Sequence, residues 1–83
     1  MEINLYAIKD CKMGKFNNPF TAENNDVAKR MLATTMLNKS IENGIYQFAE
    51  DYQLFKIGAY DNDTGELKTE VEFVANATEF KKE

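Results

Sequence analysis

The sequence predicts one small α+β domain: an antiparallel or mixed sheet of three or four strands with one helix packed on one face. Two patterns carry this prediction. Residues 66–74 alternate apolar and polar side chains after a turn-rich segment, which is typical of the second strand of a hairpin. Residues 25–38 place apolar side chains at three- and four-residue steps, which is typical of an amphipathic helix. With 83 residues, of which 43% are hydrophobic, the chain has room for one core.

The first strand is expected over residues 3–9, because apolar side chains lie on both of its faces. The polar segment that follows contains Gly14 and indicates a hairpin-like connection or an extended loop. Pro19 lacks a backbone donor, so any strand around residues 17–21 is expected to be short or to lie at a sheet edge. The first strand carries Ile3, Leu5 and Ala7 on one face and Tyr6 and Ile8 on the other.

The helix is expected to follow a group of N-cap candidates and to run to about Asn38, before a polar segment and Gly44. Residues 45–51 are expected to form a loop whose three bulky side chains tuck under the helix as a lid. The N-cap candidates are Asn24, Asn25 and Asp26, the helical stripe is Val27, Ala28, Met31, Leu32, Thr35 and Met36, and the lid side chains are Ile45, Tyr46 and Phe48.

A β-hairpin is expected from residues 52–60 and 66–74, because a strong turn signal that ends at Gly65 separates them. Gly58, inside the first of these strands, is expected to mark a bulge or the close approach of another chain. In the second strand the apolar side chains are expected to face inward and the charged ones to face water. The inward set is Leu67, Thr69, Val71 and Phe73, and the outward set is Glu66, Lys68, Glu70 and Glu72.

The ends of the chain show no targeting pattern. Residues 1–74 are expected to form the domain, and residues 75–83 a polar tail that is frayed. The N-terminus has neither a positive segment nor a long apolar run, so no signal peptide is expected. No stretch approaches the ~20 apolar residues that a membrane span requires. A soluble protein of the cytoplasm is therefore expected.

Catalysis is not expected from these side chains. The chain has no histidine, so the commonest general base is missing. Cys11 would need an activator to act as a nucleophile, and Lys9 and Lys12 beside it are the candidates. The glycines fit no phosphate-binding spacing, and the turn over residues 61–65 lacks the ligand order of a calcium loop. We expect no enzyme, no cofactor and no metal site; a thiol-dependent enzyme is the disfavoured alternative.

The net charge of −4 is unevenly distributed along the chain. Residues 1–40 carry six Lys and Arg against four Asp and Glu, whereas residues 41–83 carry four against ten. Lysines interleaved with aromatic rings, as in the first half, are the pattern of proteins that bind single-stranded nucleic acid. The alternative is a solvated lysine loop with the phenylalanines in the core. The candidate nucleic-acid contacts are Lys9, Lys12, Lys15, Phe16, Lys29 and Arg30, with Phe20 as a further ring.

The tyrosines are the candidate protein interface. Tyrosine is favoured at interfaces because it is large, stiff and half polar. The alternative is that their hydroxyls point from the rim of the core to water. A homodimer is expected as well, because the core is small and one cysteine cannot form an intrachain disulfide. The candidate interface residues are Tyr6, Tyr46, Tyr52 and Tyr60.

Five segments occur in a recognisable order and spacing. The most specific is residues 51–61, which starts Asp51-Tyr52 and ends Gly58-Ala59-Tyr60-Asp61. The other four are Leu5-Tyr6-Ala7-Ile8-Lys9-Asp10, Phe16-Asn17-Asn18-Pro19-Phe20, Asn25-Asp26-Val27-Ala28-Lys29-Arg30 and Thr64-Gly65. Together, over residues 5–67, they resemble the small nonstructural protein of gokushovirus-type microviruses, the phage ORF5 family, also labelled VP5.

The resemblance implies a nonstructural protein in the cytoplasm of an infected bacterium, with DNA binding and a part in single-stranded genome synthesis or packaging. It carries over no catalytic or binding residues. The acidic total predicts that any DNA binding is modest and strongly salt-dependent. The alternative function is a non-catalytic protein-interaction module that binds a host or phage protein through its tyrosines and its acidic hairpin.

Overall fold

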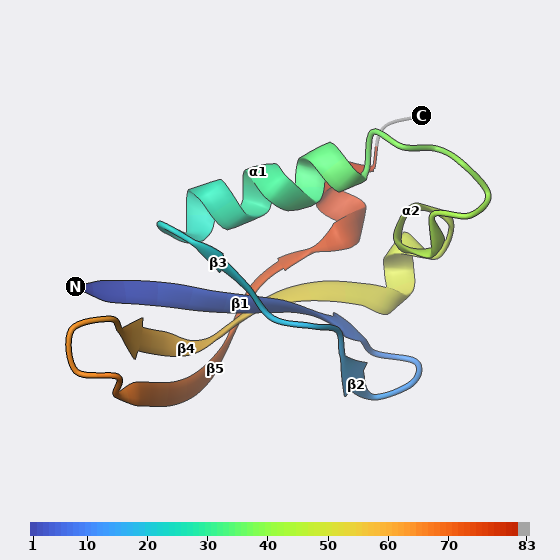
Figure 1. Cartoon of the computed structure of the whole chain (residues 1–83). Coiled ribbons are helices and arrows are strands. Elements are labelled where there is room, and N and C mark those ends of the chain that lie inside the picture. The colour runs from blue at the N-terminus through green and yellow to red at the C-terminus, as the bar shows by residue number, and fades with distance from the viewer. Residues whose placement is uncertain (82–83) are drawn as a thin grey trace.

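The computed structural model describes residues 1–81, and its fold is α+β, as predicted (Figure 1). Strands predominate, and α1 is the longest helix. The elements are β1 (Glu2–Asp10), β2 (Lys15–Phe16), β3 (Phe20–Ala22), α1 (Asn25–Thr35), α2 (Gly44–Gln47), η1 (Ala49–Asp51), β4 (Tyr52–Asp61), β5 (Leu67–Asn76) and η2 (Ala77–Phe80), of which η1 and η2 are 3₁₀ helices.

The sheet is antiparallel in every pairing, and its order is β2-β1-β4-β5, with β3 also paired to β1. It has five strands where three or four were predicted. The additional strands are short, because the segment around Pro19 bends between them: β2 covers one end of β1, and β3 covers the other. A short strand at the sheet edge near Pro19 is therefore confirmed.

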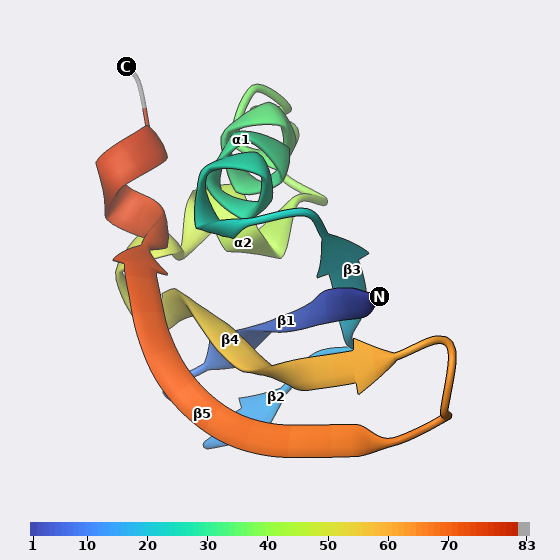
Figure 2. The same cartoon turned by 90° about the vertical axis from the view of Figure 1, so that its left-hand side faces the viewer.

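The helix packs on one face of the sheet, and the core lies between them (Figures 1 and 2). Tyr6 and Leu54 enter this core from neighbouring strands, and Leu32 and Met36 enter it from α1 and its C-terminal end. Within residues 1–81 no helix covers the other face of the sheet, which we call the open face (Figure 2). The remaining buried core residues are small: Ala28, Ala49, Ala75 and Ala77.

The helix starts as predicted and ends earlier. The Asn24 side chain accepts a hydrogen bond from the backbone N–H of Val27 at 2.9 Å, which satisfies a free donor of the first turn. The helix ends at Thr35 rather than near Asn38, because the chain then tightens: the N–H groups of Leu37 and Asn38 donate to carbonyls three residues back, at 3.1 and 3.3 Å. The Asn43 side-chain amide donates to the carbonyls of Thr35 and Asn38 at 2.9 and 2.7 Å, which satisfies carbonyls that the helix end leaves without an intrahelical partner.

The predicted loop over residues 45–51 is partly helical, since it contains α2 and η1. Ile45 and Tyr46 pack against the core, as expected of a lid. Phe48 does not, because its side chain is 58% exposed. The reason is positional: Phe48 caps both short helices, lying after the end of α2 and before the start of η1, so it belongs to neither packed helix.

The β4–β5 hairpin is confirmed, and so is the irregularity at Gly58. The register with both neighbouring strands shifts beside this glycine, which marks a bulge. Its φ is +157°, and a Cβ atom there would lie 2.1 Å from the carbonyl oxygen of Lys68. The backbone that approaches so closely belongs to β5 of the same chain.

The predicted inward face of β5 is wrong. Leu67, Val71 and Phe73 are 60%, 62% and 52% exposed. The apolar side chains of β5 do lie on one face of the strand, as predicted, but that face is the open face. The helix α1 packs on the opposite face of the sheet, against Leu54. A strand alternates whether or not a second layer covers it, so the pattern alone does not locate the core.

The frayed tail expected from residue 75 onward is also wrong for residues 75–80. Ala75 and Ala77 are fully buried, and Phe80 packs against the core. The Asn76 backbone N–H donates to the Glu79 carboxylate at 2.7 Å, which fixes the start of η2. The prediction failed because the segment is mostly polar in composition, whereas its packing depends on isolated alanines that are small enough to be buried without a long apolar run. Residues 82 and 83 of the expected tail lie outside the described residues.

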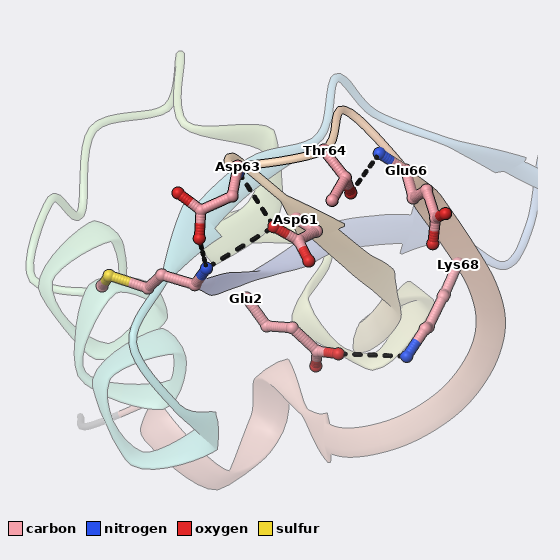
Figure 3. Close-up of polar contacts among 7 residues, drawn as sticks. Glu2, Asp61, Asp63, Thr64, Glu66 and Lys68 are labelled. Carbon is pink, nitrogen blue, oxygen red and sulfur yellow. Dashed lines mark hydrogen bonds and ion pairs between the residues drawn. The ribbon is translucent and has the colours of Figure 1, made fainter.

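Charged groups connect the start of β1 to the β4–β5 turn (Figure 3). The Met1 ammonium lies 2.6 Å from a carboxylate oxygen of Asp63 and 3.5 Å from one of Asp61. Lys68 contacts Glu2 at 3.1 Å. These groups are largely exposed, so each contact contributes little to stability on its own.

Asp61 is expected to make stability depend on pH in the acidic range. The backbone N–H of Asp63 donates to its carboxylate at 2.8 Å, and this bond is the main reason that the pKa of Asp61 lies below its ordinary value of 3.8. A carboxyl group whose pKa is lower in the folded state stabilises the fold above its unfolded pKa and loses that effect as pH falls through the folded pKa. Thermal unfolding measured from neutral to acidic pH should show this loss of stability in the parent. The Asp61→Asn variant, which has no carboxyl group to titrate at this position, should lack it. Glu42→Gln, on an exposed loop, is the control and should retain it.

Candidate nucleic-acid interface on the open face

Three phenylalanines from three strands meet on the open face, and we call them the aromatic cluster: Phe16, Phe55 and Phe73. The ring centroids of Phe16 and Phe55 are 5.5 Å apart, and those of Phe55 and Phe73 are 5.8 Å apart, both in edge-to-face geometry. Phe16 is 43% exposed and Phe73 is 52% exposed, with the half-buried Phe55 between them. The cluster therefore leaves part of its ring surface open to a ligand.

Strand alternation and register place these rings together. Leu54 points into the core, so the next side chain, Phe55, points to the open face. The register then sets Phe73 opposite Phe55. It also sets Lys9 opposite Phe16, so this lysine shares their face.

Lys9 holds a cation beside the rings. Its Nζ lies 5.5 Å from the ring centroid of Phe16 and 5.9 Å from that of Phe55, within the range of cation–π attraction. A positive charge next to exposed rings is the arrangement that accommodates a phosphate backbone with its bases stacked beside it. Of the predicted nucleic-acid contacts, the structure brings Lys9 and Phe16 together.

Lys12 and Lys15 lie close by in the chain but outside this contact. Lys12 is exposed in the turn between β1 and β2. Lys15 faces Asp10 in the register of β2, so it leaves the strand on the face opposite to that of Phe16. Both lysines belong to the hairpin that carries Phe16, and Lys12 adds positive charge to its turn.

Lys29 and Arg30 are not part of this surface. Both belong to α1, which lies across the sheet from the aromatic cluster. Arg30 lines a separate groove with Leu37, Glu79 and Phe80. The predicted contacts on the hairpin and those on the helix therefore do not share one face of the chain.

Sequence reasoning missed Phe55 and Phe73 as site residues: it placed Phe73 on the inward face of its strand and gave Phe55 no role at a site. One signal was available: residues 52–60 carry apolar side chains on both faces, which indicates a strand with a second apolar face. A strand pattern does not say which of its two faces the helix covers. Phe20, the further ring named from the sequence, lies on the core side and stacks with Tyr6 at 6.0 Å.

The four tyrosines do not form one surface. Tyr6 is wholly buried, and its hydroxyl donates to the Asn25 side chain at 2.7 Å. Burial, helped by the nearby Glu72 carboxylate, raises the pKa of this hydroxyl above its ordinary value of 10.0. Tyr6 is therefore a core residue rather than an interface residue, because α1 and β3 enclose it.

The other three tyrosines keep some exposure. Tyr52 is half-buried, and burial, followed by the charge of Asp10, raises its pKa. Tyr46 packs against the core beneath Lys81, whose Nζ is 4.8 Å from its ring centroid. Tyr60 is 38% exposed near the β4–β5 turn.

The remaining chemistry-bearing groups are dispersed. Cys11 is exposed, and its Sγ lies 3.3 Å from the side-chain oxygen of Gln53. Within residues 1–81 no three Cys, Asp or Glu side chains are grouped so that they could hold a metal ion. None of the helices in this part of the chain has the length and apolar character that crossing a membrane requires.

Comparison with known proteins identifies the family. No curated protein and no solved structure matches the chain. The family model described as Phage ORF5 protein matches residues 3–80, which is nearly the entire chain and extends beyond the segments that carried the resemblance. The match includes every strand that builds the open face. The chain therefore belongs to the Phage ORF5 protein family, and it is a bacteriophage protein.

Proposed function

We propose that this phage protein assists the synthesis or packaging of a single-stranded DNA genome by binding single-stranded DNA on the open face of its sheet. The observation that carries the proposal is the aromatic cluster, whose exposed rings lie beside the Lys9 ammonium. Stacking of a base on an aromatic ring tolerates any base, because every base has a π-face. Such binding suits a protein that must act along a whole genome rather than at one sequence.

The electrostatics of the chain set the expected strength of binding. The net charge of −4 opposes a polyanion, and the lysines near the rings are few. Stacking must then supply much of the free energy, with a salt-dependent contribution from the released counterions. We infer modest affinity that falls as salt rises, in a protein that works in the cytoplasm of the infected host and without catalysis.

The test is a titration of a labelled oligothymidine of about 16 nucleotides, at about 50 mM and about 200 mM salt. The parent should bind more weakly at the higher salt. Phe73→Ala should lower affinity by about tenfold, because one stacked base is lost. The fold should survive this change, since Phe73 is 52% exposed. Phe48→Ala is the matched control, because Phe48 is a comparably exposed ring outside the aromatic cluster.

Charge reversals separate the hairpin from the helix. Lys12→Glu combined with Lys15→Glu should weaken binding and flatten its dependence on salt. Lys29→Glu combined with Arg30→Glu, the matching pair of reversals on α1, should leave the affinity and its salt dependence nearly unaltered. Equal losses in Phe48→Ala and Phe73→Ala, or the absence of binding at low salt, would contradict the proposal.

The second candidate is a module that binds a phage or host protein. The observation in its favour is the apolar character of the open face, where Leu67 and Val71 extend the aromatic cluster along β5. Exposed apolar patches often mark protein interaction sites. This candidate predicts no salt-sensitive binding of DNA. Under either candidate we propose that the chain works as a homodimer, because the buried core is small and rich in alanine.

A further inference from the structure

The outer edge of β5 is a long unpaired strand edge. β5 has ten residues, and within residues 1–81 it pairs only with β4. The opposite side of the sheet is different, because β2 and β3 both cover β1. A long exposed edge presents a row of free N–H and C=O groups that can pair with another strand.

The side chains of this edge are also uncovered. Residues 67–73 are all exposed. Leu67, Val71 and Phe73 share the open face with the aromatic cluster, while Lys68, Glu70 and Glu72 lie on the other face of the strand, where they line a shallow charged pocket with Lys56 and Glu2. An incoming strand would therefore meet no protein layer in its way.

We propose that β5 pairs with β5 of a second copy, antiparallel, about a twofold axis at Thr69. This inference deepens the homodimer of the proposed function by naming its surface, and it does not depend on DNA binding. In this register Leu67 lies opposite Val71 of the partner, on the open face. On the other face Lys68 lies opposite Glu70 of the partner, and the twofold repeats each pair.

The charges along β5 favour a second copy of the chain as the strand that pairs with this edge. An edge that carries only one sign of charge repels its own copy, and charged edges commonly prevent pairing in this way. β5 instead alternates Lys68 with glutamates, so antiparallel self-pairing sets opposite charges across the new contact. The Lys68 side chain is 71% exposed even while it contacts Glu2, so it has room for a second carboxylate.

The proposed register also places one pair of like charges opposite each other, at a position where the repulsion is weak. Glu72 would lie opposite Glu66 of the partner. Glu66 is outside β5, in the turn, where solvent screens the repulsion. The product would be one continuous sheet across both copies, with both aromatic clusters on the same face.

The test is a charge swap read by the mass of the particle in solution. Sedimentation over a range of concentrations should show a dimer for the parent chain. Lys68→Glu and Glu70→Lys should each raise the dimer Kd by about tenfold, because each turns two attractive cross-strand pairs into repulsive ones. The double variant should restore most of the affinity. Lys39→Glu, an exposed lysine far along the chain from β5, should leave the Kd unchanged.

A cross-link tests the register itself. Thr69→Cys in a Cys11→Ser background should form a disulfide-linked dimer on mild oxidation, whereas Ser40→Cys in the same background should not. A chain that stays monomeric at every concentration would overturn the pairing. So would a dimer that ignores both the charge swap and the cysteine at position 69. Neither result bears on the oligonucleotide titration, so failure of the β5 pairing and failure of DNA binding are separately visible.

Discussion

Gly58→Ala should lower the free energy of unfolding by about 2–4 kcal/mol, among the largest effects of any single substitution in this chain. The added Cβ would lie 2.1 Å from the carbonyl oxygen of Lys68. That oxygen is backbone of β5, so it cannot rotate away as a flexible side chain would. Either the β4–β5 pairing opens beside the bulge or the bulge is rebuilt, and both disrupt the sheet. Urea unfolding followed by circular dichroism gives the change.

Gly65→Ala is the matched control for this experiment. Gly65 also has a positive φ, +79°, but beyond the glycine and its two chain neighbours no atom lies within 4 Å of the position that its Cβ would take. Its substitution should cost about 1 kcal/mol, from backbone conformation alone. Equal losses at both glycines would contradict a steric role for Gly58.

Leu54→Ala should lower the free energy of unfolding by about 2–5 kcal/mol, because it leaves a cavity beneath α1. Leu54 is fully buried and lies among the few large side chains of the core. A chain of this size has a total stability of roughly 4–12 kcal/mol, so the variant should lose a large part of it. Thermal and urea unfolding both measure the effect.

Leu67→Ala removes the same atoms from the other face of the same hairpin. Leu67 is 60% exposed, so its loss should cost no more than about 1 kcal/mol. Comparable losses for the two leucines would mean that Leu67 is buried in solution, and its contact with Val71 of the partner across paired β5 strands is one way to bury it. The comparison should be repeated at low protein concentration, where a dimer dissociates. If dimer formation buries Leu67, the cost of Leu67→Ala falls on dilution; if Leu67 is buried within one chain, the cost does not change.

The sequence predicted well those features of the fold that depend on the conformational preferences of neighbouring residues. The β4–β5 hairpin, the start of α1 beside Asn24 and the bulge at Gly58 each follow from the preference of a few neighbouring residues. The arrangement at the end of α1 was not predictable, because the Asn43 side chain, from a later loop, donates to the carbonyl of Thr35. Contacts of this kind leave no local signal.

The candidate site was predictable only in part, for a related reason. Lys9 and Phe16 could be named because they lie in one short segment with other lysines. Phe55 and Phe73 join them only through sheet register, and the exposure of all these rings depends on which face α1 covers. That choice is made by Tyr6, Leu32 and Leu54 packing together, and no single strand encodes it.

The uncovered aromatic cluster has a calorimetric consequence. Rings that already meet water in the native state add little newly hydrated apolar surface when the chain unfolds. The heat-capacity change of unfolding follows that surface, so it should fall below the usual value for a domain of this length, and the stability curve should be correspondingly flat with temperature. Association should show the complementary effect. A ligand or subunit that buries these rings removes their apolar surface from water, so its binding should have a negative heat-capacity change.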